Sequence, residues 1–235
     1  MYQVKTLENF PLEKLYQTFM KAFSDYAVPF NQDFSQYENM LKRRSYQPEI
    51  SVGAFQEDQL VGFVLSGFRK IDGQWTAYDL MTGIEPESRG KGLSNQMMTA
   101  IMEAYVEAGV EKYQLEVLQE NTTAYHLYEK QGMTIRRSFS VMQAQKELVP
   151  PDKSISQLYF VEKLSPAEWD LMETFADVAD SWQNARQSVE NVAELFDVVL
   201  AKIDNRIVGY GIVERATGDV PQLAVAKNAR RQGIG

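Results

Sequence analysis

The sequence contains no cysteine and only one histidine, His126. The first absence excludes disulfides, thiol nucleophiles and cysteine zinc sites, and the second argues against a histidine cage, so we expect no metal. No apolar run approaches the roughly 18 residues that a transmembrane helix needs. The first residues look like a strand rather than a signal peptide. We therefore expect a cytoplasmic protein.

Positively charged residues are outnumbered, because the sequence has 24 lysines and arginines against 32 aspartates and glutamates, which gives a formal net charge of −8. A nucleic-acid partner would need a basic face, so we expect none, and we expect no membrane partner. The acidity is permissive of a cationic substrate such as an amine or polyamine, although solubility explains it more simply. A homodimer is compatible with the sequence.

The 235 residues suffice for one large or two modest domains, and a hydrophobic content of 44% is ordinary for a globular protein. Periodicity and turn residues predict the order strand, two helices, three antiparallel strands, helix, strand, helix and strand. This order is typical of an α+β domain with a mixed, mostly antiparallel sheet flanked by helices. The predicted elements are residues 2–7, 11–26, 31 or 33 to 44, 48–55, 60–68, 74–84, 93–108, 113–118, 121–132 and 133–144.

A glycine-rich turn within residues 82–98 joins a predicted strand to an amphipathic helix. Gly90 and Gly92 let the main chain approach a ligand closely, and the helix N-terminus adds unpaired amides and the positive end of a dipole. Such a turn is suited to an anion. The spacing does not match a P-loop, and Asn95 stands where the dinucleotide fingerprint requires glycine.

Two motifs resemble the GNAT superfamily of N-acetyltransferases. The first is Arg89, Gly92 and Ser94 in the spacing R-x-x-G-x-S, where the family has glycine or alanine at the last position. The second is the run NTTAYHLYEKQGM at residues 121–133, with methionine in place of the family's final phenylalanine. A helix cap beside a solvated basic pair is the alternative interpretation of the first motif. The resemblance implies the GNAT acyl-CoA N-acyltransferase fold for residues 1–148.

The resemblance implies acetyl-CoA (coenzyme A) as the cofactor. The glycine turn would bind its diphosphate, and main-chain amides of the preceding strand would bind the pantetheine arm and acetyl oxygen. In the family this strand is distorted and splayed from its neighbour, and Gly83 is the expected position of the distortion. Asn121 would contact the arm or only cap its helix. The implied cofactor-binding residues are Met81, Thr82, Gly83, Ile84, Arg89, Gly90, Lys91, Gly92, Leu93, Ser94, Asn95 and Asn121.

The resemblance also implies a general acid and a general base. Tyr128 would donate a proton to the departing thiolate, because a phenol is protonated at neutral pH. The alternative role for Tyr128 is an aromatic core residue. Asp79 or Glu116 would receive the proton of the amine, directly or through water, although each also suits an ordinary solvated strand position. His126 is expected at the surface.

The second half of the chain repeats the plan of the first. Its strand is followed by a helix that begins at the capping box of Ser165 and Glu168, by a helical stretch near residues 188–195 and by three strands. The sequence IVGY at residues 207–210 matches LVGF at residues 60–63. These similarities predict an internal repeat.

The repeat divides the chain into unequal parts. Two prolines among polar residues predict a linker at 149–155, which separates a complete domain at 1–148 from a truncated GNAT-like half-domain at 156–235. The half-domain ends at RRQGIG, residues 230–235, which matches the family's diphosphate turn; a basic tail is the alternative. No helix follows this turn, so we expect the second half not to bind coenzyme A.

The leading interpretation is an acetyl-CoA-dependent N-acetyltransferase of small-molecule or peptide amines, in which a primary amine attacks directly within a ternary complex. A non-catalytic acyl-CoA-binding or regulatory module that kept the fold is the second interpretation. A pure interaction domain is the third, and the double motif weighs against it. The intact first turn together with Tyr128 favours the enzyme.

Overall fold

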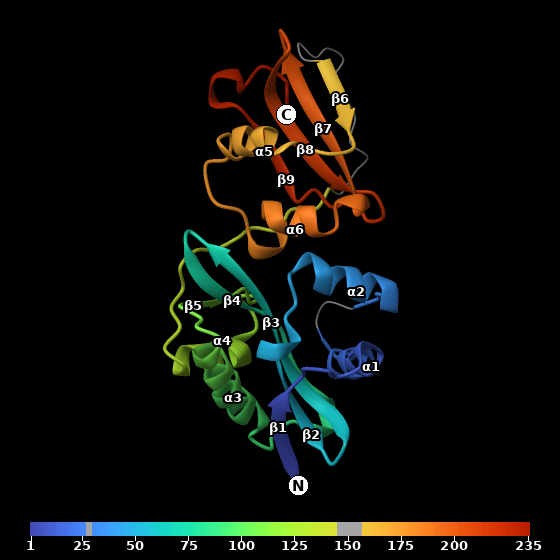
Figure 1. Ribbon diagram of the computed structural model, residues 1–235, viewed down its shortest axis with the longest axis vertical. Helices are drawn as coiled ribbons and strands as arrows, with labels where there is room; N and C mark the ends of the chain where they lie inside the picture. The colour runs from blue at the N-terminus through green and yellow to red at the C-terminus, as the bar shows by residue number, and fades with distance from the viewer. Residues whose placement is uncertain (27–29, 145–156) are drawn as a thin grey trace.

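The computed structural model describes residues 1–26, 30–144 and 157–235. Its N-terminal half contains a five-stranded sheet in the order β1-β2-β3-β4-β5, antiparallel except for the parallel pair of β4 and β5 (Figure 1). The mixed, mostly antiparallel sheet is therefore as predicted. The strands are β1 (Tyr2–Thr6), β2 (Val52–Gln56), β3 (Gln59–Ile71), β4 (Gln74–Ile84) and β5 (Lys112–Leu115).

Helices cover both faces of this sheet (Figure 1). α1 (Leu12–Ala22) and α2 (Phe34–Arg43) share one apolar core with the sheet, while α3 (Leu93–Glu107) and α4 (Thr122–Lys130) pack against the other face. α2 starts at a capping box in which Asp33 accepts from the amide of the third helical residue. This layering confirms the predicted α+β class.

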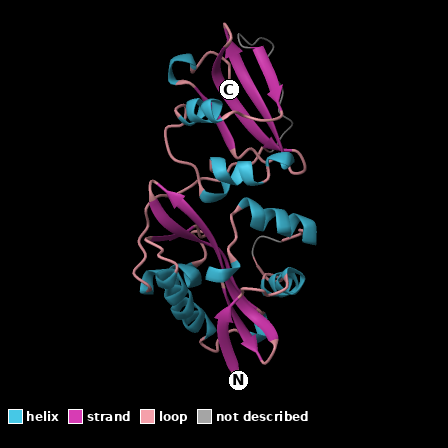
Figure 2. Cartoon of the chain, viewed as in Figure 1, coloured by secondary structure: helices cyan, strands magenta, loops and turns pink. Residues whose placement is uncertain are grey.

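The C-terminal half builds a second, fully antiparallel sheet with its own apolar core (Figure 2). α5 begins at the predicted capping box of Ser165. A single turn of 3-10 helix follows α6, where one continuous helical stretch was expected. The elements are β6 (Gln157–Val161), α5 (Pro166–Glu173), α6 (Arg186–Asn191), β7 (Phe196–Ile203), β8 (Arg206–Glu214) and β9 (Gln222–Val225).

Two arginines occupy equivalent positions in the two halves. Arg89 donates its Nε–H to the carbonyl five residues earlier (3.0 Å) and pairs with Asp25 (2.6 Å). Arg230 donates to the carbonyl five residues before it (2.9 Å) and pairs with Asp177 (2.7 Å). These parallels support the predicted repeat and the predicted partial second domain, whose boundaries stay a prediction. The expected linker at 149–155 lies outside the described residues.

The strand predicted at 133–144 is wrong, and the strand predicted at 48–55 is wrong in part. Residues 134–144 form no strand, and Ile135 and Val141 remain 72% and 96% exposed, because alternation in sequence does not supply a hydrogen-bonded neighbour. Residues 48–50 form a turn of 3-10 helix, since Pro48 cannot donate to a ladder. In the described parts of the chain, no helix is both long and apolar enough to cross a bilayer.

Candidate active site

Strands β4 and β5 separate at the position of Asp79. Their pairing ends at Asp79 and Leu115, whereas β4 continues to Ile84. Beyond Asp79, no described strand covers the edge of β4 that faced β5, so its main-chain groups are available to an extended ligand. The gap supports the predicted cofactor contacts of Met81 and Thr82, which stay predictions.

The distortion of β4 lies at Leu80, which corrects the expectation for Gly83. Leu65 pairs with Met81 and the next residue of β3 pairs with Asp79, so Leu80 is an extra residue in a β-bulge. Gly83 stays in register, and a Cβ at this position would lie 3.0 Å from an aromatic carbon on the α1 side of the sheet. Close packing therefore explains this glycine.

The glycine turn presents an open helix N-terminus. Gly90 and Gly92 have φ angles of 74° and 77°, in the left-handed region that favours glycine, and no atom lies within 4 Å of a Cβ built at either. Among the described residues, no side chain caps α3, which begins at Leu93. The buried Leu93 side chain fixes this end to the core. The first amides of α3, at Leu93, Ser94 and Asn95, thus satisfy the requirements of an anion site.

The Arg89 side chain is engaged by the end of α1 and by the strand before the turn, and its predicted place among the cofactor-binding residues stays a prediction. Its guanidinium binds both carboxylate oxygens of Asp25 (2.6 and 2.8 Å) and the carbonyls of Ala22 and Ile84. Its hydrogen bonds hold the pKa of Asp25 below the usual range. Arg89 therefore anchors the turn to the end of α1. Lys91 donates to the hydroxyl of Tyr2 at 2.8 Å.

Three hydroxyl groups converge on one carboxylate oxygen at the head of the gap. Oδ2 of Asp79 accepts from Thr82 (2.7 Å), Tyr128 (2.8 Å) and Tyr113 (3.3 Å). Asp79 is only 6% exposed, and its Oδ1 has no hydrogen-bond partner in the described chain. The sequence pointed to Asp79 and Tyr128 separately, and the structure brings them together.

Burial sets the protonation of this cluster. It raises the pKa of the Asp79 carboxyl, against the opposing effect of the hydroxyl donors. It also raises the pKa of Tyr128 above that of a free phenol, and the negative charge of Asp79 adds to the effect. Tyr128 is therefore a protonated donor at neutral pH, and Asp79 is a carboxylate that binds a proton more readily than an exposed one.

The other candidates have simpler environments. Glu116 is exposed just beyond β5 and accepts a hydrogen bond from Gln183 of the C-terminal half (3.0 Å). Asn121 caps α4 by accepting from the amide of Ala124 (3.2 Å), which is the capping role considered for it. The His126 side chain is 65% exposed, as predicted.

A cleft of about 2570 Å³ runs from this cluster to the C-terminal half. Its lining includes Asp79, Glu116 and Tyr128 of the N-terminal half and Trp182 of the C-terminal half. Sequence reasoning missed Trp182, Gln183 and Tyr113. Tyr113 stands in the predicted strand 113–118, but neither its facing nor the other two residues were inferred from local signals.

Comparisons with known proteins agree with this geometry. The model of the acetyltransferase (GNAT) family matches residues 12–133. An acetyltransferase from Pectobacterium atrosepticum is 28% identical over 107 residues, which are 45% of this chain and 70% of that protein. The L-2,4-diaminobutyric acid acetyltransferase of Marinococcus halophilus is 27% identical over 113 residues, which are 48% of this chain and 65% of that protein.

A solved structure aligns with the whole chain. It contains the glucosamine N-acetyltransferase region of a fungal multi-domain β-N-acetylglucosaminidase. The match has a TM-score of 0.66 and 14% identity, and it covers 100% of this chain and 32% of that one. This likeness concerns the fold alone.

The matched family model spans just over half of the chain and contains the gap, the glycine turn and the Tyr128 helix. The chain therefore belongs to the acetyltransferase (GNAT) family. It is an acetyltransferase, and acetyl-CoA is the acetyl donor that acetyltransferases of this family use.

Proposed function

We propose that this protein transfers an acetyl group from acetyl-CoA to a primary amine by direct attack within the cleft between β4 and β5. The observation that carries the proposal is the strand separation at Asp79, which lies beside the open N-terminus of α3. The amides from Gly90 to Asn95 would bind the diphosphate, and those of residues 81–84 would bind the pantetheine arm. Acetyl-CoA supplies an electrophilic thioester carbonyl and a thiolate leaving group.

Asp79 and Tyr128 would move the protons. Asp79 takes a proton from the acceptor ammonium through Oδ1, the oxygen that has no partner in the described chain. The amine nitrogen then bonds to the acetyl carbon and the carbon–sulfur bond breaks. Tyr128 gives its proton to the sulfur and takes one back from Asp79, because the two groups share a hydrogen bond of 2.8 Å. The second proton of the amine leaves to solvent.

Glu116 suits acceptor binding better than proton transfer to the thioester site. It is exposed at the cleft, whereas Asp79 is buried and hydrogen-bonded to the proposed acid. An exposed carboxylate in the cleft would attract a protonated amine. We assign Asp79 as the base and Glu116 as the ammonium-binding carboxylate.

A cationic amine is the acceptor class that we propose. The net charge of −8 disfavours polyanions, and two named relatives act on L-2,4-diaminobutyric acid. That compound is therefore a first acceptor to test. The cytoplasmic address and the homodimer stay predictions from the sequence.

A non-catalytic acyl-CoA-binding or regulatory module is the second candidate, because the same strand separation and glycine turn could hold acetyl-CoA without any reaction. Two measurements separate the candidates. Acetyl-CoA should raise the melting temperature of the full chain by mass action. Thiol release from acetyl-CoA should then depend on L-2,4-diaminobutyrate or butylamine. A thermal shift without amine-dependent thiol release would indicate the module, and no shift at millimolar acetyl-CoA would reject both candidates.

A further inference from the structure

A tryptophan of the C-terminal half is buried in the N-terminal half. Trp182 is only 4% exposed and stacks on Tyr78 with ring centroids 4.8 Å apart and an interplanar angle of 15°. Its indole N–H donates to the carbonyl of Arg44 (2.8 Å), and the guanidinium of Arg69 lies 4.2 Å from the ring centroid. A Cβ on Gly67 would lie 2.8 Å from the indole, so the glycine makes room for the ring.

The contacts of Trp182 and Gln183 involve the direct neighbours of Asp79 and also Glu116. Tyr78 directly precedes Asp79 in β4, and the Arg44 guanidinium donates to the carbonyl of Leu80, the bulge residue. Burial and the neighbouring Glu116 carboxylate raise the pKa of Tyr78. Glu116 also accepts from the Gln183 amide at 3.0 Å. Trp182 thus packs against β4, the strand that carries the proposed base Asp79. Gln183 contacts Glu116, the carboxylate proposed to bind the acceptor.

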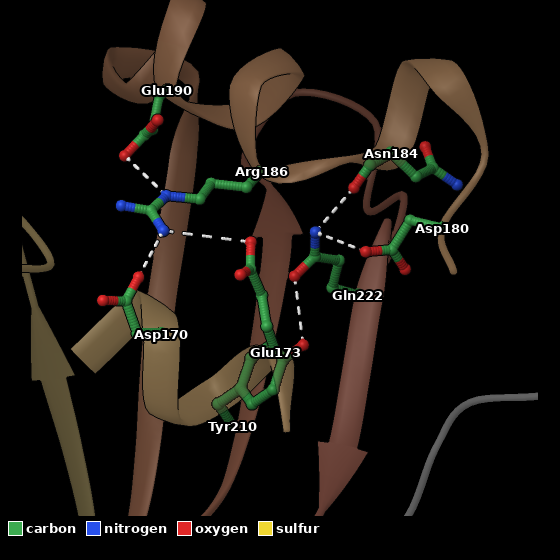
Figure 3. Close-up of polar contacts among 8 residues, drawn as sticks. All are labelled: Asp170, Glu173, Asp180, Asn184, Arg186, Glu190, Tyr210 and Gln222. Atoms are coloured by element: carbon green, nitrogen blue, oxygen red, sulfur yellow. Dashed lines mark hydrogen bonds and ion pairs between the residues drawn. The ribbon is translucent and has the colours of Figure 1, made fainter. Parts of the chain in front are cut away.

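Residues 180–186, the segment that carries Trp182, are held to the rest of the C-terminal half by polar contacts (Figure 3). Gln222 of β9 donates to Asp180 (3.2 Å) and to the carbonyl of Asn184 (2.6 Å). Arg186 donates to Asp170 of α5 at 2.8 Å. Because both ends of the segment are held in this way, the C-terminal half presents Trp182 as a preset part of the cleft wall.

We propose that the C-terminal half completes the acceptor site of the N-terminal half. In this proposal, which rests on the proposed function, Gln183 and Trp182 are positioning residues. Gln183 orients Glu116 toward the ammonium group of the acceptor, and Trp182 fixes Tyr78 and the bulge behind Asp79. The second half would therefore act in acceptor recognition.

Variants of Gln183 in the full chain test this proposal, with butylamine and L-2,4-diaminobutyrate as probes. Gln183→Ala should raise the KM of the amines on the order of fivefold, because Glu116 loses its orienting hydrogen bond. Gln183→Lys should raise it further, since the lysine ammonium would occupy the carboxylate. We expect kcat to change less than twofold and the acetyl-CoA thermal shift to stay unchanged. Gln59→Ala, which changes an exposed glutamine of β3 outside the cleft lining, is the matched control.

Trp182→Phe provides a second, independent variant, and Trp169→Phe, a buried tryptophan in the core of the C-terminal half, is its control. Only Trp182→Phe should raise the amine KM, although both variants lower the melting temperature. Unchanged amine KM in Gln183→Lys and Trp182→Phe would overturn the proposal while leaving the proposed function intact. Wild-type protein that binds acetyl-CoA but acetylates neither amine would instead reject the proposed function.

Discussion

The phenol of Tyr128 donates a hydrogen bond of 2.8 Å to Oδ2 of Asp79, where Asp79 is buried and Tyr128 is partly buried. A tyrosinate next to a charged carboxylate would be strongly disfavoured at this site. Tyr128 can therefore give up its proton most readily when Asp79 returns one. The contact couples deprotonation of the amine to protonation of the thiolate.

Tyr128→Phe tests this coupling directly. The variant keeps the ring but lacks the proton donor, so kcat should fall by about 10²–10⁴-fold, the usual range for general acid catalysis. The acetyl-CoA thermal shift should stay the same. Tyr113→Phe removes a hydroxyl on the same oxygen at the longer distance of 3.3 Å and should reduce kcat much less. Equal turnover in wild type and Tyr128→Phe would remove the tyrosine from the mechanism.

Asp79→Asn tests the buried carboxyl through stability. Burial raises the pKa of Asp79, so the folded protein favours the neutral carboxyl. The contribution of this group to the free energy of unfolding is fully present below the unfolded pKa of about 3.9, and it is lost as pH rises through the folded pKa. Asparagine does not ionise and escapes this loss. Between pH 4 and pH 8 the melting temperature of the variant should therefore improve relative to wild type.

The matched control for this titration is Asp58→Asn, which changes an exposed carboxyl in the turn between β2 and β3. This control shows what the same chemical change does to the melting temperature at an exposed position. Thermal melts in one buffer series measure both variants. A pH-independent difference for Asp79→Asn would contradict the account of a destabilising buried charge.

Local signals predicted the elements well. β4 has the predicted bounds because Asp72 and Gly73, both with positive φ, form the turn before it. Asn121 and Ser165 cap their helices as expected, since capping depends only on residues a few positions away. The strand predicted at 133–144 failed because a strand also requires a neighbour.

The site was only partly predictable. The resemblance gave the glycine turn, Asp79 and Tyr128, but the bulge at Leu80 depends on how β3 pairs with β4. Trp182 lies more than a hundred positions from Tyr78 in the sequence, and no local pattern links them. Long-range contacts of this kind are decided by packing rather than by periodicity.

Arg89→Met should weaken acetyl-CoA binding although the Arg89 guanidinium is paired with Asp25. The arginine holds the turn to Asp25 and to the end of α1, and without it the amides would lose their fixed arrangement. Arg230→Met removes the equivalent anchor in the C-terminal half, together with its Asp177 pair, and serves as the control. Titration calorimetry with acetyl-CoA should show a higher Kd for the first variant and no change for the second. Equal effects of the two substitutions would argue against a binding role for the first turn.

Gly92→Ala separates backbone strain from ligand binding. Alanine in the left-handed region costs roughly 1–2 kcal/mol of stability, and its methyl group would stand where the diphosphate is proposed to approach. Gly73→Ala introduces the same strain in the hairpin between β3 and β4, where φ is 83° and no atom lies within 4 Å of the added Cβ. Denaturant melts should show a similar loss for both variants, whereas acetyl-CoA affinity should fall only in Gly92→Ala. The two glycines share their backbone conformation, but only Gly92 lies at the start of α3. If both variants bound acetyl-CoA like the wild type, the anion site at the start of α3 would therefore be refuted.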